Sequence, residues 1–232
     1  METIEQNQVL SKHAYNILNF IKYLKWSPIL QNARGGERVC DFGCGDGGLL
    51  ELEYRNRTAI GSYIGLDTTP SIIEANSNKW KQLPWATFTI ADLSSGSDDY
   101  SAFSNIGADT VVALNVTNTI SRIKLYYYIQ NFYMCGNPDA TYYILLPKST
   151  DLITAKDIDK FITTYFTVVN KFGVLGSTED FKPVMNDWQI KMYEGLTPYY
   201  SPELLSGFMS PFFPEHCQQN LWMLKRKSIT NI

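Results

Sequence analysis

An apolar segment that ends in a carboxylate and leads straight into a glycine-rich turn constrains the fold of this chain more than any other feature. The segment covers residues 39–42, with Asp41 near its end, and the turn that follows contains Gly43, Gly45, Gly47 and Gly48. Glycines allow the backbone to bend tightly and bring its N–H groups against a ligand. The pattern predicts a buried strand, then a ligand-binding turn, then the first turn of a helix.

Two classes of ligand fit a turn of this kind. The spacing of Gly43, Gly45 and Gly48 is that of the G-x-G-x-x-G motif, which binds the pyrophosphate of a dinucleotide. Asp41 favours a different ligand, because a carboxylate just before the first glycine repels a pyrophosphate and attracts a cationic group. S-adenosylmethionine carries an ammonium and a sulfonium and is such a ligand. A dehydrogenase that uses the same turn stays as the alternative.

The turn resembles the first motif of the class I (Rossmann-like) S-adenosylmethionine-dependent methyltransferases, which is an acidic residue, any residue, and then Gly-x-Gly-x-Gly. The match is position by position at Asp41, Gly43, Gly45 and Gly47. The resemblance covers residues 36–148 through its motifs and the remainder only through architecture. It implies a site for S-adenosyl-L-methionine built on Asp41, Gly43, Cys44 and Gly45.

Segments that predict buried strands alternate with segments of helical periodicity. Strands are expected at 38–42, 63–67, 86–90, 109–114 and 140–146, and helices from the glycine turn to about 55 and at 69–80, 120–134 and 155–166, with a loop at 94–104. This alternation predicts a parallel sheet with right-handed crossovers. Segments 167–175 and 221–227 predict an antiparallel edge pair. We therefore expect an α/β fold, a doubly wound and mostly parallel seven-stranded sheet with an antiparallel C-terminal edge strand and helices on both faces.

Two boundary signals and two flanking regions complete this organisation. Thr69-Pro70 predicts a helix start with a hydroxyl cap, and residues 135–138 predict a helix stop. Residues 8–25 predict an amphipathic helix within an N-terminal segment at 1–30. Residues 176–219 lack periodicity and are rich in Pro, Gly and aromatics, as functional segments often are.

The expected organisation is a single methyltransferase domain over residues 1–232. Its cofactor-binding core is expected at 36–150, and its aromatic-rich substrate cap at 176–219. The aromatic side chains of that segment can wall an apolar or planar acceptor, form the core of a small cap, or make a dimer surface. A homodimer is therefore one of the assemblies that the sequence allows.

Carboxylates follow three successive predicted strands, at Asp41, Asp67 and Asp92. In open α/β sheets the ligand lies beyond the carboxyl ends of the strands. The resemblance implies that Asp67, with Thr68 beside it, accepts the ribose hydroxyls. It also implies that Asp92 and the N–H of Leu93 read the adenine edge, and that Asn115 lies beneath the methionine part.

The segment after the fourth strand bears on the methyl acceptor. Residues 115–118 read Asn-Val-Thr-Asn and lack the paired prolines found in methylases of nucleic-acid amino groups, and the chain has no Pro-Cys dipeptide for pyrimidine carbon five. A net charge of −3 also argues against nucleic acid. We expect an oxygen or nitrogen of a small molecule as acceptor. A methyltransferase acting on RNA, DNA or protein, and a non-catalytic S-adenosylmethionine-binding module, are the alternatives.

The candidates for proton transfer are few. The chain has two histidines, and His216, just before the last predicted strand, is the candidate general base. A histidine that only caps a loop is the other interpretation. The four cysteines form no CxxC pair, so no metal site is expected, and no apolar run approaches the length of a membrane span. These features predict a cytoplasmic protein without a membrane partner.

Overall fold

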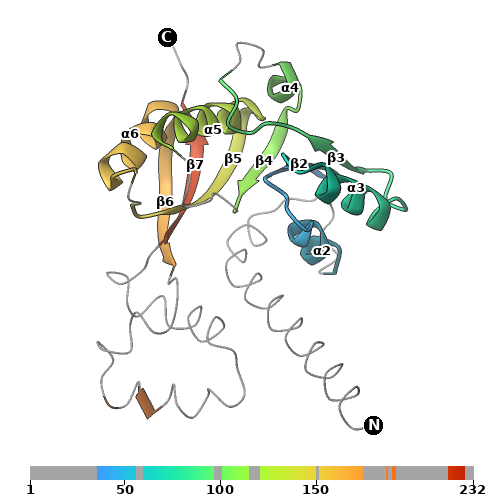
Figure 1. Cartoon of the computed structure of the whole chain (residues 1–232), viewed down its shortest axis with the longest axis horizontal. Helices are drawn as coiled ribbons and strands as arrows, with labels where there is room; N and C mark the ends of the chain where they lie inside the picture. The colour runs from blue at the N-terminus through green and yellow to red at the C-terminus, as the bar shows by residue number, and fades with distance from the viewer. Residues whose placement is uncertain are drawn as a thin grey trace. The chain divides into compact units, whose positions relative to one another are not determined.

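The computed structural model describes residues 36–55, 60–96, 101–114, 121–149, 152–174, 187, 190–191 and 219–227 (Figure 1). The chain divides into two compact units, residues 1–31 with 173–219 and residues 32–172 with 220–232. Nearly all described residues belong to the second unit. The predicted helix at 8–25 lies outside the described residues, as does nearly all of the predicted cap at 176–219.

The described residues form one seven-stranded sheet. In spatial order its strands are β3 (Ala86–Ile90), β2 (Ile60–Asp67), β1 (Glu37–Phe42), β4 (Ala108–Ala113), β5 (Gly136–Pro147), β7 (Gln219–Arg226) and β6 (Phe166–Val174). The pairs β3–β2, β2–β1, β1–β4 and β4–β5 are parallel. Strand β7 is antiparallel and lies between β5 and β6, so the predicted antiparallel pair occupies this edge with β6 outermost. The predicted fold class is confirmed.

Helices cover both faces of the sheet (Figure 1). Helices α2 (Gly48–Arg55) and α3 (Pro70–Lys79) lie on one face, and α4 (Ser101–Ser104), α5 (Arg122–Met134) and α6 (Ala155–Tyr165) lie on the other. Right-handed crossovers explain this division, because the chain moves outward from β1 to β3 and then returns to β4 on the other side of β1. The order therefore reverses between β1 and β4, which is where open α/β sheets bind ligands.

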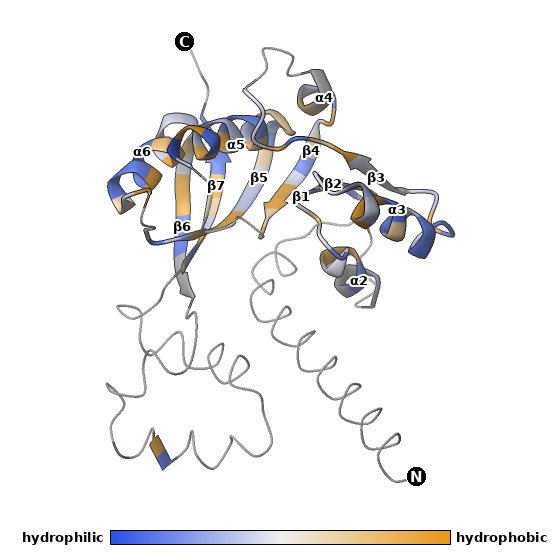
Figure 2. Ribbon diagram, viewed as in Figure 1, coloured by the Kyte–Doolittle hydropathy of each residue, from blue (hydrophilic) through white to orange (hydrophobic). Residues whose placement is uncertain are grey.

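The main apolar core lies between the sheet and the second group of helices. The ring of Phe42 meets the edge of Tyr128 at 4.8 Å between ring centroids, and Phe132 meets Tyr142 at 5.3 Å. Helix α6 buries one side and exposes the other, and Figure 2 shows hydrophobic and hydrophilic residues around its axis. Its first turn is closed by a capping box between Thr154 and Asp157. Among the described helices, none is long and apolar enough to cross a membrane.

Three local predictions differ from the structure. Thr69 is the residue before α3 and Pro70 begins the helix, but the Thr69 hydroxyl makes no capping hydrogen bond, so the predicted hydroxyl cap is wrong. The predicted loop at 94–104 contains the short helix α4. Strand β5 begins at Gly136, earlier than the expected residue 140.

The early start of β5 has a geometric reason. Ala108 pairs with Gly136, whereas Thr110 pairs with Thr141, so the ladder is irregular between these pairs. Pro138 lies within this irregularity, where its missing N–H costs no regular ladder hydrogen bond. A proline that predicts a break is thereby accommodated inside the strand.

Candidate functional site

The glycine turn adopts a backbone that only glycine accepts without strain. Gly43, Gly45 and Gly47 have φ values of 91°, 49° and 72°. The N–H groups of Gly43 and Cys44 both donate to the carbonyl oxygen of Leu66, at 2.8 and 2.9 Å. The turn after β1 is therefore fastened to the end of the neighbouring strand β2, and Gly48 begins α2 directly after it.

Asp67 joins two backbone segments at the end of β2. Its Oδ2 accepts the N–H of Gly45 at 3.1 Å, and its Oδ1 accepts the N–H of Thr69 at 2.9 Å. The side chain thus connects the glycine turn with the start of α3. Thr68, which lies between Asp67 and Thr69 in the sequence, is exposed. Asp67, the carboxylate predicted after the second strand, therefore lies beside the glycine turn.

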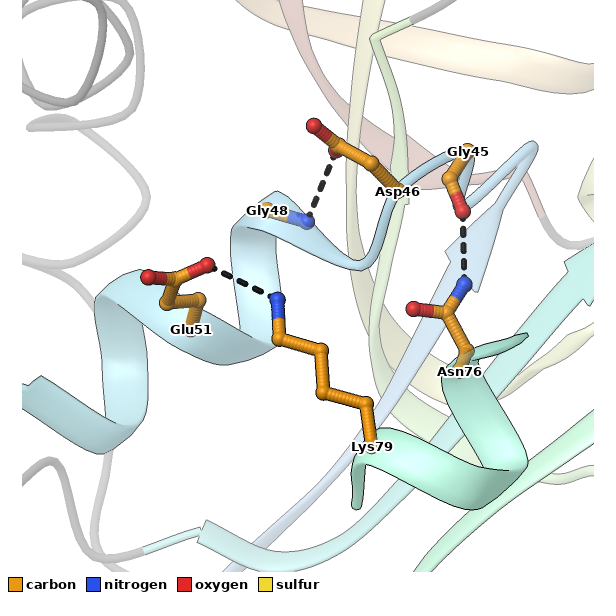
Figure 3. A network of polar contacts seen from close by, with 6 residues as sticks. All are labelled: Gly45, Asp46, Gly48, Glu51, Asn76 and Lys79. Carbon is orange, nitrogen blue, oxygen red and sulfur yellow. Dashed lines mark hydrogen bonds and ion pairs between the residues drawn. The ribbon is translucent and has the colours of Figure 1, made fainter. Parts of the chain in front are cut away.

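Asn76 of α3 holds the glycine turn through a second contact at Gly45 (Figure 3). Its side chain is buried, and its Nδ2 donates to the carbonyl oxygen of Gly45 at 2.7 Å. A Cβ on Gly47 would lie only 2.6 Å from Asn76 Oδ1. Lys79, one turn further along α3, pairs with Glu51 of α2 at 2.9 Å. Helix α3 therefore fixes both the turn and the helix that follows it.

A hollow of about 260 Å³ lies where α3 faces the end of the turn. Its lining is formed by Asp46, Ser71, Ile72, Ala75, Asn76 and Lys79. Asp46 itself closes the turn, since its Oδ1 accepts the N–H of Gly48 at 3.2 Å (Figure 3).

Asp41 is buried beneath the turn and is only 4 % exposed. Its Oδ2 accepts the hydroxyl of Tyr63, a fully buried residue of β2, at 2.7 Å. Burial is the main cause that raises the pKa of the Cys44 thiol well above its usual range, and the nearby carboxylates of Asp41 and Asp67 raise it further. The Cys44 thiol is therefore neutral near pH 7, and the carboxylates at the turn are those of Asp41, Asp46 and Asp67.

The loop after β3 lies next to the end of β2. Ala91 donates its N–H to the carbonyl oxygen of Asp67 at 2.9 Å. Asp92 is exposed, and its Oδ1 accepts both the N–H and the hydroxyl of Ser94, at 3.1 and 3.2 Å. The side chain of Leu93 is buried in the core.

The register of the strands explains why these residues meet. Asp41 lies opposite Gly65 across the β1–β2 pair, and Asp67 lies opposite Ile90 across the β2–β3 pair. The carboxyl ends of three neighbouring strands therefore meet at one edge, with β1 in the middle of the sheet. The residues that the structure places there are Asp41, Gly43, Cys44, Gly45, Asp67, Thr68, Asp92 and Leu93. The other two predicted site residues, Asn115 and His216, lie outside the described residues.

Three residues at this edge escape the sequence argument, namely Tyr63, Asn76 and Asn131. Each donates a hydrogen bond to a residue far away in the chain. The sequence signal is weak, because Tyr63 and Asn131 lie among mainly apolar residues whereas Asn76 lies among polar ones. In either setting the residue type does not say which group its side chain contacts.

The comparisons with known proteins bear on the fold. No protein-family model and no curated protein sequence matches the chain. A TehB-like SAM-dependent methyltransferase from Corynebacterium glutamicum has a TM-score of 0.56 and 15 % identity, covering 88 % of both chains. The N-methyltransferase NodS from Bradyrhizobium japonicum, in complex with S-adenosyl-L-homocysteine, has a TM-score of 0.53 and 11 % identity, covering 94 % of this chain and 86 % of NodS.

A third solved structure carries a different activity on a similar fold. The [4+2]-cyclase SpnF has a TM-score of 0.54 and 14 % identity, covering 88 % of this chain and 80 % of its own. At these identities the likeness establishes the fold and not the reaction. The fold is that of the class I S-adenosylmethionine-dependent methyltransferases, as the glycine turn predicts.

Proposed function

We propose that this chain is an S-adenosyl-L-methionine-dependent methyltransferase that transfers the methyl group to an oxygen or nitrogen of a small-molecule acceptor. The observation that carries the proposal is the junction at Asp67, where one carboxylate holds the N–H of Gly45 in the glycine turn and that of Thr69 at the start of α3. The glycine turn that Asp67 holds follows β1, which borders the point where the strand order reverses, and that point is the usual ligand position in such a sheet.

The charge of the site favours a cationic ligand. Asp41 lies buried beneath the turn, and an anionic pyrophosphate next to its carboxylate is disfavoured by like-charge repulsion. S-adenosylmethionine brings positive charge on its ammonium and sulfonium. The NodS structure, which contains S-adenosyl-L-homocysteine, supports the same class of ligand on this fold.

Asp67 retains the capacity to hold a ribose. An ionised carboxylate offers about four acceptor positions, and the two backbone N–H groups occupy one on each oxygen. We propose that the remaining positions accept the two ribose hydroxyls, with Thr68 beside them. The two backbone contacts orient the carboxylate before the ligand arrives, which reduces the ordering cost of binding.

The loop after β3 is proposed to bind the base. Asp92 can accept hydrogen bonds from the adenine amino group, and the N–H of Leu93 can donate to a ring nitrogen. The bond between Ser94 and Oδ1 fixes the orientation of the Asp92 carboxylate within its own turn. The turn after β1 is proposed to hold the methionine end with Asp41, Gly43, Cys44 and Gly45, and Asn115 is proposed to lie beneath it.

The cofactor supplies an activated methyl group on a positively charged sulfur. The chain contributes alignment, because an in-line displacement depends on holding the acceptor atom opposite the breaking bond. A general base is needed only for an acceptor that is protonated at neutral pH, and His216 is the proposed residue for that role. The segment at 176–219 is proposed to shape the acceptor site.

A second candidate is a protein that holds the adenosyl ligand without transferring its methyl group. The likeness to the [4+2]-cyclase SpnF supports keeping it, because that fold neighbour is described by a different reaction. An acceptor that is RNA, DNA or protein is the other alternative. A cytoplasmic location and a homodimer stay predictions from the sequence.

A thermal unfolding screen tests the cofactor assignment. A ligand that binds only the native state raises stability by about 2.7 kcal/mol at a hundredfold excess over Kd. We expect S-adenosylmethionine and S-adenosylhomocysteine to raise Tm and NAD to leave it unchanged. A rise with NAD alone would favour a dehydrogenase, and no rise with any of the three would refute the assignment. Release of S-adenosylhomocysteine with a pool of small-molecule acceptors then separates an enzyme from a binder.

A further inference from the structure

A buried asparagine in helix α5 holds the loop that follows β3. Asn131 is 1 % exposed, and its Nδ2 donates to the carbonyl oxygens of Leu93 and Ser95 at 3.1 and 3.0 Å. The side-chain amide has two N–H donors, so each one has a carbonyl partner. Both partners lie in the loop that contains Asp92.

A second contact from the same helix shapes this loop. Tyr127 lies so close to Gly96 that a Cβ at that glycine would be 2.6 Å from the tyrosine ring. Within the loop, the N–H of Ser95 donates to the carbonyl oxygen of Asp92 at 3.2 Å. Helix α5 therefore supports the far side of a short turn whose near side presents the Asp92 carboxylate.

A buried asparagine is an unusual choice for the last turn of α5, where Asn131 lies. Asparagine is a poor helix former, and a buried amide is costly unless it is fully hydrogen bonded. Here the loop supplies that bonding, and the loop carbonyls in turn would lose their partners without the amide. The contact is specific to the loop, because it joins two backbone oxygens rather than filling apolar space.

We propose that Asn131 is a positioning residue that sets the base specificity of the cofactor site by holding the Asp92–Ser95 turn in place. This proposal rests on the proposed function, in which Asp92 and the Leu93 N–H read the adenine edge. Asn131 touches neither the base nor the reacting atoms. It acts by fixing the backbone on the C-terminal side of Leu93, while the buried Leu93 side chain fixes the residue from below.

The hydrogen-bonding pattern of the base makes the proposed role of Asn131 measurable. Adenine offers amino N–H donors beside a ring-nitrogen acceptor, whereas hypoxanthine offers a carbonyl acceptor beside a ring N–H donor. A fixed carboxylate next to a fixed backbone N–H therefore favours adenine and rejects hypoxanthine. A loosened loop can rotate away from the mismatch, so its ability to discriminate falls more than its ability to bind.

The test compares the affinities of S-adenosylhomocysteine and S-inosylhomocysteine by calorimetry. The wild-type protein should prefer the adenosyl ligand. Asn131→Leu removes both donors at similar volume, and we expect it to lower the affinity ratio by about five- to tenfold, the factor that the loss of about one hydrogen bond corresponds to. Asn131→Gln keeps the donors but displaces them by one methylene, and a smaller fall is expected. If Asn131→Leu does not fold, the affinity ratio measured for Asn131→Gln tests the proposal in its place.

Two controls separate positioning from general destabilisation. Ile162→Val removes one buried methylene from α6, where Ile162 is fully buried, and should lower stability with the ratio unchanged. Asn76→Leu removes the support of the glycine turn and should weaken both ligands by a similar factor. An unchanged ratio in the folded Asn131 variants would overturn the role of Asn131. A wild-type protein that binds neither ligand would instead refute the proposed function, and one that binds both equally would refute base reading by this loop.

Discussion

Replacing Gly47 by alanine should destabilise the protein through two separable effects. The first is backbone strain, because Gly47 has a φ of 72°, and an L-residue in the left-handed region costs about 1–2 kcal/mol. The second is steric, because the added Cβ would lie 2.6 Å from Asn76 Oδ1 and 3.3 Å from Trp80 Nε1. Asn76 must then move and release the carbonyl oxygen of Gly45, which it holds at 2.7 Å.

The magnitude follows from adding these two effects. The carbonyl oxygen of Gly45 is half-buried, so losing its partner should cost about 1–2 kcal/mol, and Gly47→Ala should lower the free energy of unfolding by about 2–4 kcal/mol in total. Gly36→Ala is the matched control, since Gly36 has a similar φ of 82° and nothing within 4 Å of the added Cβ. That variant should lose only the strain of about 1–2 kcal/mol.

Urea unfolding followed by circular dichroism measures both variants, and a double mutant tests the cause. In an Asn76→Ala background the 2.6 Å conflict is gone and the 3.3 Å approach to Trp80 Nε1 remains, so Gly47→Ala should cost only slightly more than Gly36→Ala does. Equal losses for the two single glycine variants would refute the claim that Asn76 occupies the space at Gly47. A cost that persists in the double mutant would place the conflict elsewhere.

Three other predictions concern the charged and polar groups of the site. Asp67→Asn should weaken S-adenosylhomocysteine by about tenfold or more, since hydrogen bonds to a charged group contribute about 1.5–3 kcal/mol, and calorimetry that finds wild-type affinity would show that Asp67 does not hold the ribose. Tyr63→Phe removes the 2.7 Å bond to buried Asp41 and should lower the free energy of unfolding by about 1–3 kcal/mol in urea titrations, whereas an unchanged midpoint would mean that Asp41 does not depend on it. Burial raises the pKa of the Cys44 thiol above its usual 9.0 in the folded state, so the unfolded chain loses this proton at a lower pH. The free energy of unfolding should therefore be unaffected by Cys44 below pH 9 and should fall as the pH rises above 9. Cys44→Ala should flatten part of that fall, and an identical pH dependence in wild type and variant would contradict the assignment.

The parts of the site that sequence predicts are those encoded over short distances. The glycine turn, the carboxylate that precedes it and the carboxylate after β2 are visible because strand, turn and helix follow one another within a few residues. Their meeting in space then follows from parallel pairing, which places the ends of neighbouring strands at one edge. Right-handed crossovers predict on which face of the sheet each helix lies once the strand order is known, but they do not predict where that order reverses.

The supports of the site depend on contacts that no local pattern encodes. Asn76 is 31 residues from Gly45, and Asn131 is 38 residues from Leu93. Each is one of several polar residues in its helix, and an exposed side chain would fit its place in the sequence equally well. Thr69 shows the same limit at short range, because its predicted capping hydroxyl is unused while its N–H is held by Asp67. The irregular β4–β5 ladder that accommodates Pro138 likewise depends on the partner strand.

Backbone amide chemical shifts during titration with S-adenosylhomocysteine test most directly the claim that the three strand ends form one ligand site. We expect saturable shifts at residues 43–45, 67–69 and 92–95, with the same affinity at all three segments. Asp67→Asn should weaken binding at all three together. Binding with shifts confined to other parts of the chain, or three segments that titrate with different affinities, would contradict the claim of a single site.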